Sequence, residues 1–182
     1  MELKTFVWYT EDMMAKDKTR KTKTFEDLQM WQEAIALAEK IYQITSQSEE
    51  LSSDRSLVDQ LRRASVSVSA NISEGFERQR HSKKEYLRFL SIAKGSAGEV
   101  RSLLAVAHRV GYIDYQTFCL TKFNALDISK MLGCQMKYLE QRIAIAEITS
   151  KQNALKYRGR YRSPYKAKAS WYLSQLDCCY CF

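Results

Sequence analysis

The sequence predicts an all-α protein, an antiparallel up-down four-helix bundle with an extra arm at each end. Apolar residues recur three and four positions apart over four long segments, which is the pattern of amphipathic helices. The chain of 182 residues has one Pro and six Gly, too few turn-forming residues for a many-stranded sheet. We therefore assign residues 1–23 to a basic N-terminal arm, 24–148 to the bundle and 149–182 to a basic, aromatic C-terminal tail.

The first predicted helix covers about residues 24–46. Thr24 followed by Asp27 fits an N-cap with an acidic residue three positions later. Apolar residues follow at helical spacing at these positions: Leu28, Trp31, Ile35, Ala38 and Tyr42. We expect the polar stretch 46–54 to be a loop, because its acidic residues suit the start of a following helix.

The second predicted helix covers about residues 54–78, and its core stripe consists of Leu57, Leu61, Ala64, Val68, Ile72 and Gly75. A ladder of polar residues runs beside this stripe: Gln60, Arg63, Ser67, Asn71, Glu74 and Arg78. Such a ladder predicts an interhelical hydrogen-bond network, and we assign these residues and Gly75 to structural or oligomer contacts. Val66 falls opposite the stripe, where it would face a partner subunit in an oligomer.

The third predicted helix begins at Ser82, which forms a second capping pattern with Glu85, and ends before Gly111. Gly95 and Gly98 weaken a helix, so we expect another backbone to approach closely there. Six cations fall within an arc of roughly 140° that is turned away from the core: Lys83, Lys84, Arg88, Lys94, Arg101 and Arg109.

The fourth predicted helix is capped by Asp114 and covers about residues 115–148. Its inward residues are Phe118, Ala125, Leu126, Leu132, Met136, Leu139 and Ile143. Because the connections between the four helices are short, neighbouring helices should be antiparallel.

The net charge of +8 is placed unevenly along the chain. Residues 25–54 hold seven acidic residues against one Lys, whereas residues 62–109 hold ten basic residues against four acidic ones. Residues 149–182 hold seven basic residues and one acidic residue. The bundle is therefore polarised and both arms are basic, which favours a polyanionic partner such as nucleic acid.

The sequence favours a cytoplasmic protein without membrane contact, cofactor or metal. No apolar run approaches the roughly 18 residues of a membrane span, and residues 1–10 lack the pattern of a signal peptide. Five Cys residues are an odd number, which does not indicate a disulfide framework. Cys178, Cys179 and Cys181 lack the fourth ligand and the usual spacer of a zinc site.

The stretch QLRRASVSVSANISEGFERQ resembles the four-helix-bundle family of proteins encoded in intervening sequences of bacterial 23S ribosomal RNA. The resemblance covers about residues 24–140 and rests on Gln60, Arg62, Arg63, Ala64, Ser67, Asn71, Ile72, Ser73, Glu74 and Gly75, then Phe89, Ala93, Gly95, Ser96 and Glu99. It implies a homopentamer without known enzymatic activity. Some relatives are accessory proteins of diversity-generating retroelements, which bind a reverse transcriptase and its template RNA. The loop SQSEELSSDRSL lacks the Pro and Gly usual there, and both arms lie outside the family domain.

The favoured hypothesis is a non-enzymatic, homo-oligomeric RNA-binding scaffold. The basic arc of the third helix would contact phosphates and be repeated around a ring. In the tail, Tyr157 and Tyr161 would stack on unpaired bases between the phosphate contacts of Arg158, Arg160 and Arg162. Two alternatives stay open: an accessory subunit that binds a reverse transcriptase and its template RNA, and a protein-interaction module without nucleic acid.

An enzyme is disfavoured by the residues present. The candidates for acid–base chemistry are Glu74 and Glu99 beside Asn71, as acid and base, with His81 or His108 as helpers. Both carboxylates have capping or salt-bridge settings, and the sequence holds neither a nucleophile–base pair at fixed spacing nor a glycine-rich phosphate loop. Structural roles are therefore the favoured interpretation of these side chains.

Overall fold

The computed structural model describes residues 23–160, with side chains as far as residue 153. Its elements are a short 3-10 helix, η1 (Phe25–Asp27), and five α-helices: α2 (Gln29–Gln47), α3 (Glu49–Ser53), α4 (Arg55–Arg78), α5 (Lys83–Arg109) and α6 (Tyr115–Arg160). The described part of the chain contains no strand, which confirms the all-α prediction. Residues up to Glu140 form one compact unit and those from Gln141 form a second.

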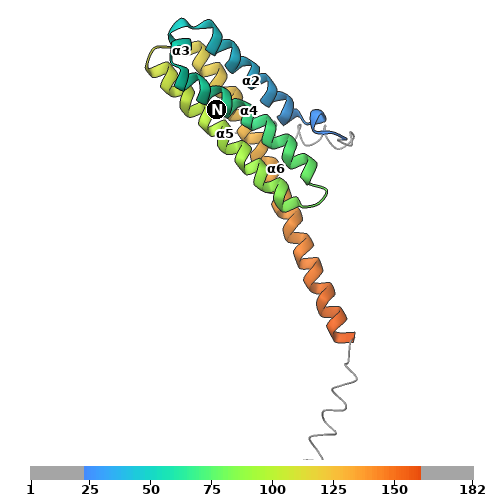
Figure 1. The fold of residues 1–182 in the computed structure, drawn as a ribbon. Coiled ribbons are helices and arrows are strands. Elements are labelled where there is room, and N and C mark those ends of the chain that lie inside the picture. Colours follow the sequence, from blue (N-terminus) through green and yellow to red (C-terminus); the bar gives the residue numbers. More distant parts are fainter. Residues whose placement is uncertain (1–22, 161–182) are drawn as a thin grey trace, which may run out of the picture. The chain divides into compact units, whose positions relative to one another are not determined.

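Within the first unit, α2, α4, α5 and the first part of α6 run alternately up and down side by side (Figure 1). The core stripe predicted on the second helix is confirmed, because Leu57, Leu61, Ala64, Val68, Ile72 and Gly75 are all buried on α4. The other helices meet it with these fully buried large side chains: Leu37, Ile41, Tyr86, Leu90, Leu104, Ile128 and Leu132. Each such aliphatic side chain contributes about 1.5–3 kcal/mol by leaving water.

Local capping sets where the helices begin. The Asp54 carboxylate accepts a hydrogen bond from Leu57 N at 3.0 Å at the start of α4, and Ser82 Oγ accepts one from Glu85 N at 3.2 Å at the start of α5. At the start of α6, Asp114 accepts bonds from Thr117 N and Thr117 Oγ1 at 2.8 and 2.7 Å. These bonds, the backbone bond first, hold the pKa of the Asp114 carboxyl below its usual range.

The start of the bundle differs from the prediction at two places. Leu28 has extended backbone angles, φ −76° and ψ 120°, so the first turn is a separate 3-10 helix and α2 begins at Gln29. The predicted loop 46–54 contains the one-turn helix α3, which Ser48 caps by accepting a hydrogen bond from Leu51 N at 3.2 Å. Leu51 is fully buried, so burial of one apolar side chain keeps this turn helical.

Arg62 joins α4 to α2, a role that its position in the stretch QLRRASVSVSANISEGFERQ does not predict. Its Nε donates to Thr45 Oγ1 at 2.9 Å, and its Nη2 donates to Ser46 Oγ at 3.2 Å. The guanidinium also lies 4.7 Å from the centroid of the Tyr42 ring, within reach of a cation–π interaction. Arg62 is therefore engaged in holding two helices together.

Gly111 ends α5 as predicted. Its φ is +87°, a conformation that side chains other than glycine rarely adopt. The two hydrogen bonds of a Schellman motif are present, from Tyr112 N to Ala107 O at 2.9 Å and from Gly111 N to His108 O at 3.1 Å. The chain thus reverses within a few residues, and Asp114 starts the next helix.

Helix α6 continues to Arg160, twelve residues beyond the end predicted at about residue 148. The prediction ended the helix where the apolar periodicity fades. The residues after that point nevertheless contain no Pro before Pro164, so nothing in the backbone stops the helix there.

The close approach of two helices lies at Gly75 and not at Gly95 and Gly98, where the sequence predicts it. A Cβ atom on Gly75 would stand 2.8 Å from the Phe89 Cβ and 2.9 Å from the Tyr86 Cδ2, so α4 and α5 meet there. The expectation of a close backbone at Gly95 and Gly98 is wrong within the described residues. Nothing lies within 4 Å of a Cβ at Gly95, and only the Arg101 guanidinium, at 3.7 Å, lies near one at Gly98.

Candidate nucleic-acid interface

The predicted polar ladder of α4 forms an interhelical contact around Ser67. The hydroxyls of Ser67 on α4 and Ser96 on α5 lie 2.9 Å apart. Asn71 Nδ2 donates to the Ser67 carbonyl at 2.7 Å and lies 3.0 Å from Ser67 Oγ. Because Ser67, Asn71 and Ser96 are partly or fully buried, these bonds satisfy polar groups that would otherwise be costly to shield from water.

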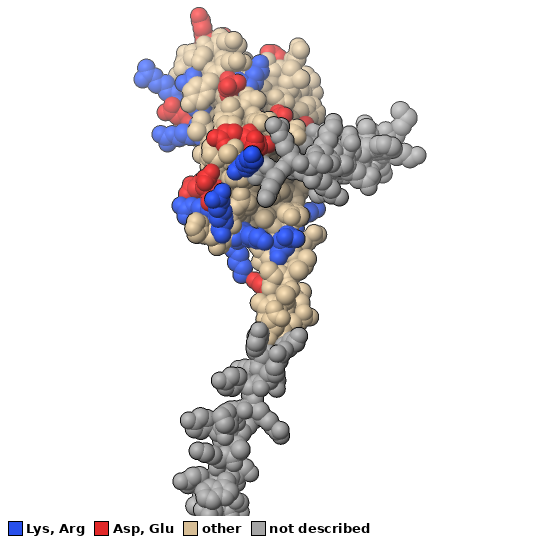
Figure 2. Space-filling model, turned by 90° about the vertical axis from the view of Figure 1, so that its right-hand side faces the viewer, with Lys and Arg blue, Asp and Glu red and all other residues tan. Residues whose placement is uncertain are grey.

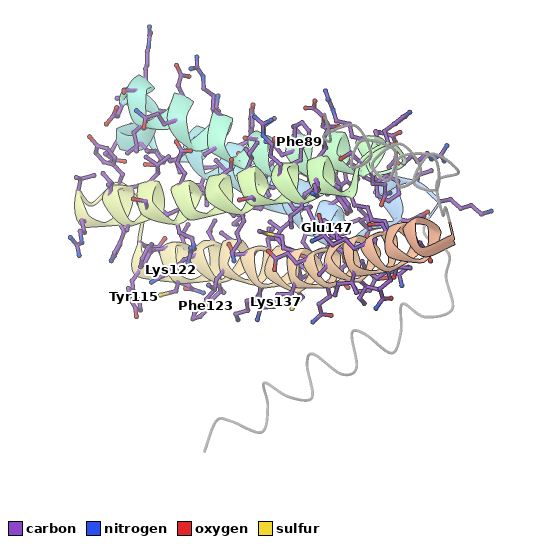
Figure 3. All side chains as sticks on the ribbon, turned by 90° about the horizontal axis from the view of Figure 1, so that it is seen from below. Phe89, Tyr115, Lys122, Phe123, Lys137 and Glu147 are labelled. Atoms are coloured by element: carbon purple, nitrogen blue, oxygen red, sulfur yellow. The ribbon has the colours of Figure 1, made fainter. Side chains whose placement is uncertain are left out.

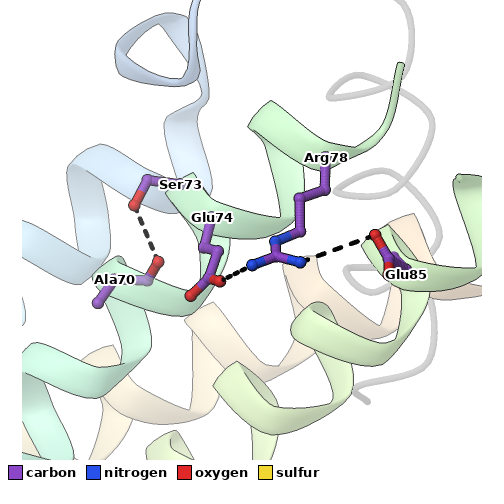
Figure 4. A network of polar contacts seen from close by, with 5 residues as sticks. All are labelled: Ala70, Ser73, Glu74, Arg78 and Glu85. Atoms are coloured by element: carbon purple, nitrogen blue, oxygen red, sulfur yellow. Dashed lines mark hydrogen bonds and ion pairs between the residues drawn. The ribbon is translucent and has the colours of Figure 1, made fainter. Parts of the chain in front are cut away.

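The ladder ends in an exposed charged group at the α4–α5 turn (Figure 4). Arg78 Nη2 lies 2.7 Å from Glu74 Oε1, and Arg78 Nη1 lies 4.0 Å from Glu85 Oε2 on α5. The Arg78 guanidinium also lies 5.1 Å from the centroid of the Phe89 ring. Gln60 and Arg63 at the other end of the ladder are exposed, so the ladder combines a half-buried centre with solvated ends.

Most of the predicted basic arc of α5 faces solvent. Its exposed members are Lys83, Lys84, Arg88, Lys94 and Arg109. Arg101 is half-buried, and its Nε is shielded from solvent without a hydrogen-bond partner among the described residues. Figure 2 shows that Lys and Arg gather over the end of the bundle that carries the α4–α5 turn.

Arg101 is half-buried because α6 packs along one flank of the arc. Lys94 Nζ lies 3.4 Å from the position of a Cβ on Gly133 of α6. Nearer the α5–α6 turn, the ring of His108 is stacked on that of Phe118 with centroids 4.8 Å apart. The arc is thus bordered by a second helix on this flank.

Helix α6 contributes exposed aromatic and basic side chains to which the sequence alone assigned no function. Tyr115 is 69% exposed and Phe123 is 59% exposed. Figure 3 shows both side chains, with that of Lys137, along the edge of α6 that faces away from α5. Lys122 Nζ lies 5.2 Å from the centroid of the Phe118 ring, which fixes its ammonium near the α5–α6 turn. Aromatic residues beside Lys at outward helical positions are the signal that would have found them.

The candidates for acid–base chemistry are separated in the structure. Asn71 is bonded to Ser67, and Glu74 pairs with Arg78. His108 is stacked on Phe118 far along α5, and its Nδ1 lies 3.1 Å from the Ile113 carbonyl oxygen. In the described part of the chain, no cluster of three or more His, Cys, Asp or Glu side chains has the arrangement of a metal site.

The tail candidates are placed only in part. Tyr157, Arg158 and Arg160 belong to α6, whose side chains are described only to residue 153. Tyr161 and Arg162 lie outside the described residues, as do Cys178, Cys179 and Cys181. Across residues 23–160, none of the helices has an apolar stretch long enough to cross a membrane.

Comparison with known proteins agrees with this geometry. The fold and the basic helix surface define a small helical-bundle protein with a polarised charge. Residues 26–134 match the family described as 23S rRNA-intervening sequence protein, and the chain belongs to that family. The fold is similar to that of a protein of unknown function from the S23 ribosomal protein family of Bacteroides thetaiotaomicron. That likeness has a TM-score of 0.53 at 22% identity and covers 59% of this chain and 98% of the other. No curated protein matches the chain.

Proposed function

We propose that this protein is a non-enzymatic, homo-oligomeric RNA-binding scaffold, with a pentamer as the expected assembly. The observation that carries the proposal is the exposed row of cations along α5: Lys83, Lys84, Arg88, Lys94 and Arg109. Phosphates bound there would release condensed counterions, which is the main source of sequence-independent affinity for nucleic acid. Membership of a family named for an rRNA intervening sequence favours RNA as the ligand.

Helix α5 carries two acidic residues, Glu85 and Glu99, against six cations. Glu85 lies on the flank that faces α4, where it is 4.0 Å from Arg78. Glu99 follows Glu85 by fourteen residues, which places it about 40° from Glu85 around the helix, in the direction of Arg88. The six cations of α5 therefore outnumber its two acidic residues, so the helix carries a net positive charge whose field would extend into solvent.

Oligomerisation would use the flank of α5 that lies on the α4 side, together with the outer side of α4. Val66 is 43% exposed and Ile92 is 42% exposed. They flank the Ser67–Ser96 hydroxyl contact, because Val66 precedes Ser67 and the carbonyl of Ile92 accepts a bond from Ser96 Oγ at 3.2 Å. An apolar rim around a satisfied polar centre suits contact with another protomer. Repeating the cation row around a closed ring would multiply its affinity for a long polyanion.

The test is the salt dependence of RNA binding by the full chain. The logarithm of the binding constant should fall steeply with the logarithm of the salt concentration. The double variant Lys84→Glu with Arg88→Glu should flatten that slope by at least about 1 unit, because single-stranded binding changes by about 0.7 per phosphate contact. Binding that varies little with salt in the unmodified protein would overturn the proposal.

A matched control is available on the acidic side of the bundle. Lys40 on α2 and Arg55 at the start of α4 are both exposed, and their reversal to Glu changes the net charge by the same amount. This control should leave the salt slope close to that of the unmodified protein. Equal losses in the two double variants would mean that net charge alone, and not the cation row of α5, governs binding.

A further inference from the structure

The first turns of α6 carry an uncharged apolar surface on their outer side. Tyr115, Leu120 and Phe123 are 69%, 56% and 59% exposed, whereas large apolar side chains usually lie in a core. Tyr115 and Phe123 lie on the edge of α6 that faces away from α5 (Figure 3). The one charged residue in the stretch 115–123 is Lys122, whose ammonium lies over the Phe118 ring, 5.2 Å from its centroid. We name this surface the α6 patch, and it consists of Tyr115, Leu120, Phe123 and the half-buried Cys119.

The α6 patch lies beside the point where the chain enters the bundle. Gln29 and Glu33, at the start of α2, line one pocket together with Asn124 and Asp127 of α6. Leu120 precedes Asp127 by seven residues, so the two lie within about 20° of each other around α6. Helix α6 therefore presents the patch and the pocket on the same side.

The N-terminal arm is long enough to reach the α6 patch. Residues 1–22 lie outside the described residues, and their sequence contains a run of four large apolar residues: Phe6, Val7, Trp8 and Tyr9. Tyr9 precedes Lys23, the first described residue, by fourteen positions, and a chain of that length spans up to about 46 Å. The patch is within this range, because Gln29 follows Lys23 by six positions and shares a pocket with α6.

The charges of the arm next to Lys23 are opposite to those around the pocket. Residues 16–23 hold five basic residues and one acidic residue, whereas residues 25–33 hold three acidic residues and no basic residue. Glu33 is exposed at the pocket, and Asp127, whose carboxylate lies 2.8 Å from Lys130 Nζ, supplies a second carboxylate there. The basic segment before Lys23 is therefore attracted towards the pocket. That course brings residues 6–9 to the α6 patch.

We propose that residues 6–9 of this chain's own N-terminal arm pack on the α6 patch, with Trp8 against Leu120 and Phe123. The removal of apolar surface from water on both sides drives such a contact. The arm is favoured over a separate protein or a second copy, because its covalent attachment beside the patch gives it a high effective concentration. The contact does not depend on RNA binding, so its failure would leave the proposed function standing.

The experiment follows the fluorescence of Trp8 in the full chain. The substitutions Trp31→Phe and Trp171→Phe remove the other two of the three Trp residues. In the folded protein, the emission of Trp8 should lie at a shorter wavelength than in the urea-unfolded chain, and acrylamide should quench it less. Leu120→Ser combined with Phe123→Ser should shift the emission to the wavelength of the unfolded chain and raise the quenching to the same level.

The matched control changes two exposed apolar residues outside the α6 patch. Val106 and Val110 are 46% and 54% exposed, on α5 and at its end. Val106→Ser combined with Val110→Ser should leave the emission and the quenching of Trp8 unchanged. Circular dichroism should show the same helix content in both double variants, which separates loss of the contact from loss of the fold.

A second measurement probes the α6 patch from the side of the bundle. Phe6→Ser combined with Tyr9→Ser should speed the reaction of Cys119 with a thiol reagent, because Cys119 belongs to the patch that the arm covers. Peptide mass mapping separates Cys119 from the other four Cys residues of the chain. An unchanged rate at Cys119 would contradict the proposal even if the emission of Trp8 behaved as expected.

Three results would overturn the proposal. The first is an emission of Trp8 that is the same in the folded and the unfolded chain. The second is a short-wavelength emission that Leu120→Ser with Phe123→Ser leaves unchanged, since Trp8 would then be packed elsewhere. The third is loss of the short-wavelength emission on dilution, in step with a fall in mass by light scattering, because the arm would then lie on a neighbouring copy.

Discussion

Gly75 of α4 and Phe89 of α5 mark a close approach of two helices in the bundle. A Cβ atom on Gly75 would stand 2.8 Å from the Phe89 Cβ, which is closer than two carbon atoms can pack. The Tyr86 ring lies on the same spot, with its Cδ2 2.9 Å away. Neither neighbour is the free end of a flexible chain, so glycine is the residue that the packing of α4 against α5 requires.

Gly75→Ala should therefore destabilise the protein by about 1–3 kcal/mol, the usual cost of overpacking a well-filled contact. Gly95→Ala is the matched control, because Gly95 is exposed within α5 and a Cβ there meets nothing within 4 Å. That substitution should stabilise by about 0.5–1 kcal/mol through helix propensity. Urea denaturation measures both, and a destabilisation by Gly95→Ala equal to that of Gly75→Ala would contradict the packing argument.

Asn71→Ala should lower the free energy of unfolding by about 1 kcal/mol, because it removes the two contacts of Asn71 Nδ2 with Ser67. Glu74→Ala should cost less, about 0.3–0.5 kcal/mol, since the Glu74 and Arg78 side chains are about half exposed and solvent screens their ion pair. Ser73→Ala serves as control, because Ser73 Oγ bonds only back to the Ala70 carbonyl of its own helix in this region (Figure 4). A thermal melting experiment in which Glu74→Ala is more destabilising than Asn71→Ala would refute this order.

Burial raises the pKa of the Tyr86 hydroxyl from 10.0 to about 12, against the opposing effect of a hydrogen bond from Gln135. A raised folded-state pKa means that the folded protein holds the proton more tightly than the unfolded chain. The stability that Tyr86 contributes is therefore complete below pH 10 and is lost as the pH rises from about 10 towards about 12.

Tyr86→Phe removes this titration. The difference in unfolding free energy between the unmodified protein and the variant should be constant below pH 10 and change by roughly 2–3 kcal/mol, to the variant's advantage, by pH 12. Urea denaturation at a series of pH values measures this difference. The titration of the other Tyr and Lys residues is common to both proteins and cancels in the difference. A difference that stays flat through this range would show that the hydroxyl does not titrate from a buried position.

Val66→Asp combined with Ile92→Asp should disperse the expected oligomer while leaving the helices intact. Both side chains are more than two-fifths exposed in the protomer, so the carboxylates would remain hydrated unless a partner covers them. Light scattering reports the mass and circular dichroism reports the helix content. Val110→Asp is the control, since Val110 is 54% exposed at the end of α5, away from the Ser67–Ser96 contact. An unchanged mass in the double variant would remove these residues from the interface.

The sequence predicts the bundle because its signals are local. The stripe from Leu57 to Gly75 and the caps at Ser82 and Asp114 each depend on residues a few positions apart, and all occur where predicted. Helix α3 escapes prediction because five residues are too few to display a period, although Ser48 three positions before the buried Leu51 is a usable signal.

The candidate interface is harder to predict because it depends on which helix lies beside which. The arc on α5 follows from helical geometry alone, but the half-burial of Arg101 follows from α6 packing on that flank. Tyr115, Phe123 and Lys137 lie on the edge of α6 that faces away from α5, and this placement likewise exists only in three dimensions. A single sequence predicts where each residue lies around its own helix. It does not predict which sides of two helices pack against each other.

The serial order of the helices also affects how fast the chain reaches its fold. The contacts of α4 with α5 and of α5 with the start of α6 join neighbours in sequence across the four residues Gln79–Ser82 and the tight turn at Gly111. Gln29 and Glu33 of α2 line one pocket together with Asn124 and Asp127 of α6, so bringing α2 and α6 together joins parts of the chain that are far apart in sequence. Chains dominated by local contacts fold in microseconds to milliseconds. We expect the α4–α5 hairpin to form early and the closing of α2 on α6 to limit the rate.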